Sequence, residues 1–355
     1  MKKLYIIICS LGISSFSYAG EGKISANIQN MNGKAGEYVY AQTNGDKVSY
    51  LKWDIKNIPI LNLGYDYTVG NFEFSIVGKK NVSKNYRSGA MKDYDWFSSK
   101  EESDDEDGIA WFVGTKEEAE KRERKGLDKI TQQDDGKYVV SYIPQEKDRG
   151  SLSNFSENRN YVKDIMGLDL SLKYYLKNSE KIRLSTAFGI DYDKYEFYAL
   201  SGDQRNYIPG IGYTINKGEG KKGITYKQKF VTPYIGINSV YIPNEKWEVS
   251  FGLKGSVLGR ARAVDKHLER GSFETVETYK NLKYLSSNLQ VKYNWNENFS
   301  INSGVEFVKH FKSKKSTVRV TPDEITSDNS VETIKNIGGI SNHNISYSLG
   351  FEYKF

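Results

Sequence analysis

The chain has 355 residues and a formal net charge of +6, with 51 Lys and Arg against 45 Asp and Glu. Its mean hydropathy is −0.64, and no segment after the N-terminus is apolar enough for a transmembrane helix. Yet 14% of its residues are aromatic, 27 of them Tyr, and it has 32 Gly. This composition suits a membrane β-barrel, because only every second strand residue faces lipid while lumen and loops are polar.

The N-terminus has the pattern of a secretory signal peptide. Two lysines precede an apolar run at 4–13, and small residues stand at the cleavage-specifying positions that end at Ala19. We therefore expect residues 1–19 to be removed. Cys9, the sole cysteine, lies in this segment, so we expect the mature chain to have no disulfide and no thiolate. An exported chain also has no nucleic-acid partner.

Apolar and polar residues alternate with period two in several later segments, which predicts strands with one apolar face. The clearest segments are 72–76, 168–176, 182–190, 247–253, 299–307 and 344–355. The last of these ends on the aromatic Phe355, as the closing strand of an outer-membrane barrel does. An ordinary edge strand is the alternative interpretation of that segment.

The connections between these segments differ in length. Short polar turns are predicted near 69–71, 178–180, 243–245 and 296–298, and long polar stretches at about 31–46, 90–157, 201–224, 268–278 and 317–341. Four turns and five loops make ten antiparallel strands, with short turns periplasmic and long loops extracellular. A soluble β-sandwich would also alternate, but it would not separate short from long connections. We predict one barrel domain at 20–355.

The stretch 99–150 differs from the rest of the chain and is predicted to be an extended extracellular loop insertion. It contains an acidic run at 101–107, followed by a basic, helix-prone run at 116–129. A solvated loop is the simpler interpretation, and a lid formed by pairing of the two runs is the alternative.

Two short motifs near predicted strand ends bring ionisable side chains together. Asp93 and Asp95, and likewise Asp265 and His267, are two residues apart, so each pair points to one side of an extended chain. An aspartate pair can share a proton and bind water, and a carboxylate can orient a histidine that acts as a general base. Strict alternation gives Asp265 and His267 the lipid-facing parity of their strand. We therefore predict a bulge or twist near Gly255 or Gly259. The alternative is that the strand top lies above the membrane, where the outward face no longer meets lipid.

Longer stretches resemble the omptin family of outer-membrane proteases of Gram-negative bacteria. They are NGKAGEYVY at 32–40, KVSYLKWDIKN at 47–57, AMKDYDWFSS at 90–99, TYKQKFVTPYIGI at 225–237, DKH at 265–267 and FEYKF at the end. The resemblance implies an aspartyl-type endopeptidase that uses water and no metal, with Asp93, Asp95, Asp265 and His267 catalytic. It also implies cleavage of extracellular peptides and proteins at basic, dibasic-like sites.

The resemblance further implies a substrate pocket. Glu37 matches the family's pocket glutamate, and Met91 and Ile224 match apolar positions that line the cleft. Packing at the barrel rim is the alternative role for the two apolar residues. The family's second pocket acid falls on Ala263, so we expect the preference for Arg or Lys to persist in a weaker form.

Lipopolysaccharide is the other partner that the resemblance implies, as an activating lipid rather than a cofactor of the reaction. Lys194 and Lys229 fall at the family's basic positions for lipid phosphate and share the lipid-facing parity of their strands. Lys280 or Lys283 is expected to complete the cluster. His310 and His343 are expected to be structural or solvated. We expect a monomer.

Two alternatives remain open at this stage. The first is a catalytically silent adhesin with the omptin fold that displays the insertion. The second is a small diffusion porin, which would make the two catalytic-type pairs a coincidence. The motif pairs therefore need a three-dimensional test.

Overall fold

The computed structural model describes residues 20–98, 109–123, 129–132, 136, 138–142, 146–208, 212–269, 273–321 and 331–355. The predicted signal segment lies outside this range. In the described part, no helix is both long enough and apolar enough to cross a membrane.

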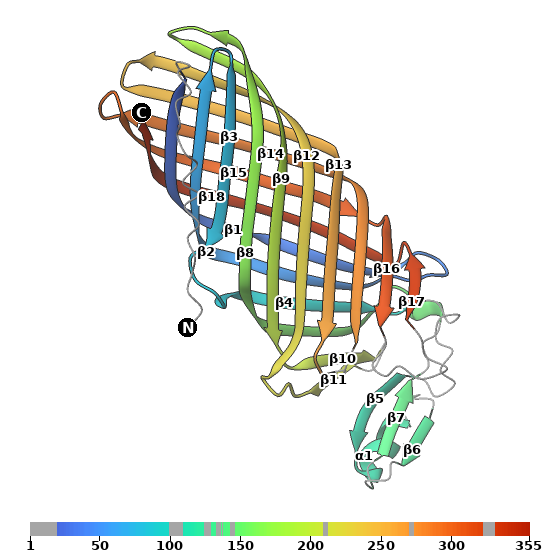
Figure 1. Ribbon diagram of the computed structural model, residues 1–355. Helices are drawn as coiled ribbons and strands as arrows, with labels where there is room; N and C mark the ends of the chain where they lie inside the picture. The colour runs from blue at the N-terminus through green and yellow to red at the C-terminus, as the bar shows by residue number, and fades with distance from the viewer. Residues whose placement is uncertain are drawn as a thin grey trace.

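Long antiparallel strands close into a barrel (Figure 1). The strands of the wall are β1 (Glu21–Tyr40), β2 (Lys47–Val69), β3 (Phe72–Asn81), β4 (Tyr86–Trp96), β8 (Leu152–Asn178), β9 (Ile182–Leu200), β12 (Lys222–Asn244), β13 (Trp247–His267), β14 (Glu274–Asn294), β15 (Phe299–Ser313) and β18 (Gly338–Lys354). Neighbours in chain order pair with each other, except β3 with β4, and β1 pairs with β18 to close the ring. Both β3 and β4 lie between β2 and β8. The antiparallel barrel is confirmed, and the described ring has ten strands when β3 and β4 count as one interrupted strand.

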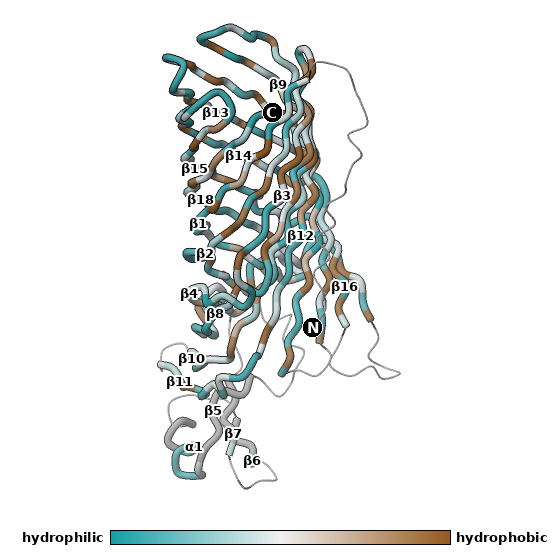
Figure 2. Tube along the Cα trace, turned by 60° about the vertical axis from the view of Figure 1, so that its left-hand side comes forward, coloured by the Kyte–Doolittle hydropathy of each residue, from teal (hydrophilic) through white to brown (hydrophobic). Residues whose placement is uncertain are grey.

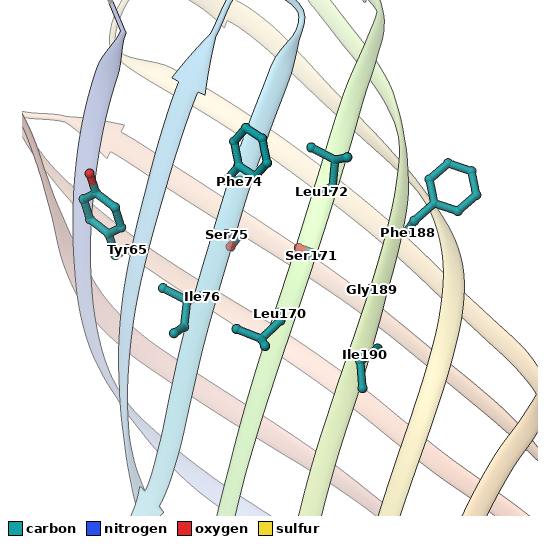
Figure 3. Close-up of a pocket in the computed structure, with 10 residues that line it drawn as sticks. All are labelled: Tyr65, Phe74, Ser75, Ile76, Leu170, Ser171, Leu172, Phe188, Gly189 and Ile190. Carbon is teal, nitrogen blue, oxygen red and sulfur yellow. The ribbon is translucent and has the colours of Figure 1, made fainter. Parts of the chain in front are cut away.

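One end of the barrel carries an outward-facing apolar belt. Phe188, Ile235 and Leu349 are exposed by 61%, 66% and 59%, although all three are large apolar side chains. Hydropathy alternates along the strands in Figure 2, as expected when lipid covers one face and the lumen the other. In Figure 3 the apolar side chains on β3, β8 and β9 stand out from the wall, whereas Ser75 and Ser171 lie behind it. The belt lies on the side of the short turns.

The lumen at the level of the belt is filled rather than open. Lys79 Nζ lies 2.5 Å from Asp193 Oδ1, and both side chains are largely or wholly buried. The imidazole of His310 stacks on Phe230 with ring centroids 3.9 Å apart, and its Nε2 lies 3.5 Å from Asp193 Oδ2. Buried charges of this kind are retained when they are paired. The expectation that His310 is structural is consistent with this position.

Several stretches predicted as long loops contain strand. β1 continues to Tyr40, β14 begins at Glu274, and His343 lies within β18 rather than before it. Short hairpin strands occupy two other predicted loops: β10 (Gln204–Ile208), β11 (Gly212–Asn216), β16 (Ser316–Thr321) and β17 (Glu332–Lys335). The reason is physical. Beyond the belt the outer face of a strand meets water, and the inner face carries buried polar side chains such as Glu37 and Glu277. The apolar alternation that reveals a strand in the sequence therefore disappears.

The insertion contains a small fold of its own. β5 (Ile109–Gly114), β6 (Lys129–Gln132) and β7 (Tyr138–Tyr142) form a separate three-stranded sheet, accompanied by the helix α1 (Lys116–Glu123) and a short 3-10 turn at Glu146–Asp148. α1 begins with a capping box, because Glu118 N donates to Thr115 Oγ1 at 3.4 Å and Thr115 N donates to Glu118 Oε2 at 3.0 Å. The first part of the helix-prone run is therefore helical, over Lys116–Glu123. The acidic run at 101–107 lies outside the described residues.

Candidate active site

Asp93 and Asp95 are carried by β4, beyond a bulge that sets their direction. The register of β4 against β8 shifts between Arg87 and Ala90. Gly89 has φ of +63°, and a side chain there would meet Asp54 Oδ2 at 2.8 Å, so the bulge requires glycine. Asp93 and Asp95 then share the parity of Met91, which is buried inside the barrel.

The bulge that was predicted in β13 is present. The register of β13 against β14 shifts between Ser256 and Gly259, and again between Gly259 and Ala261. Val257 and Leu258 are both exposed, by 62% and 61%, which breaks the alternation. Beyond this point the odd-numbered residues face the lumen. Asp265 is consequently 4% exposed rather than turned toward lipid.

Asp265 and His267 form a contact of the kind expected for an oriented base. His267 Nε2 lies 2.8 Å from Asp265 Oδ2, with side-chain exposures of 26% and 6%. Because Asp265 accepts from Nε2, the Nδ1 atom of the ring is the one left to accept a proton from another group. The edge of the Phe273 ring packs against His267 at 5.2 Å between centroids and restricts its movement.

The two pairs lie on strands from opposite sides of the barrel, β4 and β13, next to a floor of aromatic side chains. Trp53 of β2 stacks on Tyr226 of β12 across the lumen, with centroids 5.8 Å apart. Asp265 is the cross-strand partner of Tyr226. Met91 is the cross-strand partner of Trp53, and Asp93 lies two residues beyond Met91 on β4. Asp265 is therefore level with this floor, and Asp93 lies beyond it, away from the apolar belt.

Glu37 of β1 lies in the same layer, 3% exposed. Burial raises its pKa well above the usual value, and the charges of Asp265, Glu277 and Asp93 raise it further. The neighbouring Trp53 indole acts in the opposite direction. Because the charges of Asp265 and Asp93 both act on Glu37, the predicted pocket acid lies near one member of each predicted catalytic pair.

The two predicted apolar pocket residues also lie at this level. Met91 is 3% exposed, and its Sδ accepts a hydrogen bond from Asn158 Nδ2 at 3.8 Å. Ile224 is 7% exposed and pairs with His267 along the sheet. Both belong to the main cluster of buried side chains, so they contribute packing whether or not they contact a substrate.

Glu277 of β14 is a site residue that the sequence reasoning missed. It pairs with Ala263 along the sheet and is 3% exposed. Burial raises its pKa to about 8, with Asp265 contributing in the same direction. The signal in the sequence was that Glu277 and Tyr279 are two residues apart and so share one face of a strand. That signal lay within the stretch 268–278, which was predicted to be a loop.

The lysines predicted to bind lipid lie on the outer wall. Lys194 and Lys229 are direct neighbours across β9 and β12, and Lys229 pairs with Arg262 of β13, a cation that the sequence reasoning missed. Lys194 is also paired with Asp164 and Glu196, each at 2.9 Å. Lys280 is exposed on β14. A role in lipid binding stays a prediction.

Comparison with known proteins bears on this geometry. The family model described as the Omptin family matches residues 20–110 and 136–355. The chain belongs to the omptin family. The match leaves out residues 111–135, which lie within the insertion that carries α1.

Relatives of this omptin-family chain are distant but span almost its whole length. The plasminogen activator of Yersinia pestis is 24% identical, with 94% of this chain and 89% of that protein covered. Protease 7 of Escherichia coli O157:H7 is 25% identical, with 99% of each covered. The outer membrane protease IcsP of Shigella flexneri is 24% identical, with 93% and 89% covered.

A solved structure confirms the fold. The crystal structure of the outer membrane protease OmpT from Escherichia coli superimposes with a TM-score of 0.75 at 20% identity, covering 96% of this chain and 98% of that one. The family match and these relatives together identify the chain as an outer-membrane protease.

Proposed function

We propose that this omptin-family protease is an endopeptidase that cleaves extracellular peptides and proteins at basic sites with an activated water. The observation that carries the proposal is the contact between Asp265 and His267 beside the buried acid Glu37. Perturbed titratable groups that converge in a cleft are typical of catalytic sites.

In the proposed mechanism, Asp93 and Asp95 position a water molecule, and His267 is the general base. The water oxygen attacks the scissile carbonyl carbon while its proton passes to Nδ1 of His267. Asp265, bound to Nε2 at 2.8 Å, holds the ring and stabilises the imidazolium that forms. His267 then gives the proton to the leaving nitrogen as the C–N bond breaks.

Specificity for basic residues is supported by the charge of the cleft. Glu37 is buried among other carboxylates, and the strongest influences on it within the described residues include no lysine or arginine. A buried charge without a partner is costly. A substrate Arg or Lys side chain would supply the missing opposite charge.

The activity test is a fluorogenic Arg-Arg peptide offered to protein that has been reconstituted with lipopolysaccharide. Wild type should cut the peptide, and His267→Ala should not. His343→Ala is the matched control, because His343 faces outward on β18. Cleavage by His267→Ala at the wild-type rate would exclude His267 as the base.

A silent adhesin is the second candidate, and the separately folded insertion around α1 is the observation in its favour. It predicts no cleavage by wild type in the same assay. An open diffusion porin is disfavoured, because Trp53, Phe230 and Tyr226 fill the lumen and are at most 1% exposed.

A further inference from the structure

Glu277 occupies the place where a second pocket acid would be expected. Ala263, the position that lacks an acid, is the direct partner of Glu277 in the β13–β14 ladder. Side chains of directly opposed residues have Cβ atoms about 4.5–5.5 Å apart. A glutamate on β14 can thus deliver a carboxylate to nearly the same volume as an acid on β13.

The carboxylate of Glu277 is held in a defined position. Tyr279, two residues along the same strand, donates its hydroxyl hydrogen to Glu277 Oε2. The other carboxylate oxygen, Glu277 Oε1, lies next to Gly338 of β18. A Cβ atom added at Gly338 would be 2.5 Å from this oxygen. The lack of a side chain at Gly338 therefore makes room for this carboxylate.

Glu277 belongs to an acidic cluster that lacks a cation. Glu37 faces it from β1, Asp265 from β13 and Tyr226 from β12, with Tyr279 on its own strand. The groups that act most on Glu37 and Glu277 include no lysine or arginine of the described chain. Glu37 Oε2 and Asp265 Oδ1 also have no hydrogen-bond partner there. The cluster is built to receive positive charge.

The geometry favours an organic cation. In the described part of the chain, no three His, Cys, Asp or Glu side chains converge as metal ligands. The stacked rings of Trp53 and Tyr226 lie beside the acids, and an aromatic and acidic surrounding suits a planar guanidinium. Gln228 fixes this floor, since its Nε2 lies 3.1 Å from Tyr226 Oη and 3.3 Å from Gly36 O.

We propose that Glu277 supplies the second carboxylate of the substrate pocket in place of the acid missing at Ala263. Glu37 and Glu277 together then bind the guanidinium or ammonium group of the residue before the scissile bond. This inference rests on the proposed endopeptidase function. It revises the expectation that a single carboxylate leaves the preference for basic residues weak.

The proposal carries a pH dependence. With its pKa raised to about 8, Glu277 is mostly protonated at neutral pH in the free enzyme. A bound guanidinium favours the ionised form, so binding releases a proton. Discrimination for Arg should therefore increase as pH rises toward 8 and level off above it.

The test compares two peptides that differ only in having Arg or its neutral isostere citrulline before the scissile bond. The catalytic base acts on both peptides alike, so its pH dependence cancels when the kcat/KM value of one peptide is divided by that of the other. Glu277→Gln should lower this ratio by about 10- to 100-fold, the scale of a lost charge-assisted hydrogen bond, and should remove its rise with pH. Glu274→Gln is the matched control, because Glu274 lies on the same strand and pairs with Lys266 instead.

A rescue variant separates a pocket role from a structural one. Ala263→Asp in the Glu277→Gln background should restore the ratio, whereas Ala263→Asp alone should change it little. Heat-modifiable gel mobility verifies that each barrel is folded. A folded Glu277→Gln protein with the wild-type ratio would overturn the role of Glu277 alone. Failure of wild type to cut either peptide would instead overturn the proposed function.

Discussion

Replacement of Asp265 by Asn tests whether this carboxylate orients the catalytic base. Asp265 Oδ2 and His267 Nε2 are 2.8 Å apart, within the range of a charge-assisted hydrogen bond. Such a bond is worth about 1.5–3 kcal/mol, and each 1.4 kcal/mol changes a rate about tenfold. We therefore expect kcat to fall by about 10- to 150-fold. The 26% exposure of the imidazole favours the lower part of this range.

The asparagine variant also acts through the tautomer of His267. The Asn amide can donate to Nε2, which leaves the proton on Nδ1 and removes the atom that should accept a proton from water. The assay is kcat at saturating fluorogenic peptide, with lipopolysaccharide fixed and folding verified by heat-modifiable mobility. A folded variant whose kcat stays within twofold of wild type would refute this reasoning.

The remaining predictions concern the water site, the lipid and the packed lumen. Asp93→Ala and Asp95→Ala should each reduce the cleavage rate by about 10²-fold with intact folding, and wild-type rates in either variant would remove that residue from the mechanism. The Lys194→Ala, Lys229→Ala double variant should fold normally but need more lipopolysaccharide for half-maximal activity, and an unchanged titration would rule out this site. Lys79→Met leaves a buried carboxylate without its cation, so unfolding should cost about 3–5 kcal/mol less, and an unchanged denaturant midpoint would contradict the lumen pairing described above.

The strands that cross the apolar belt could be predicted from the sequence because lipid and lumen impose opposite demands on alternate residues. The strand portions beyond the belt could not, since polar residues such as those of β10 and β17 satisfy both faces there. The sequence allowed two explanations for the outward parity of Asp265: a bulge in β13, or a strand end that lies above the lipid. The register shifts of β13 against β14 show that the bulge is present.

Only part of the candidate site could be predicted from the sequence. Motif spacing identified Asp93, Asp95, Asp265 and His267, because residues i and i+2 share a face within a strand. Glu277 escaped notice because its relation to Ala263 is a cross-strand register, which alternation within a strand does not specify.

The most direct test of the central claim is an unbiased peptide-library cleavage profile, read by mass spectrometry, for wild type and His267→Ala in the same lipopolysaccharide preparation. The account predicts that wild type generates new termini next to Arg or Lys and that His267→Ala generates none of them. Identical products from both proteins, or wild-type cuts with no relation to basic residues, would contradict it.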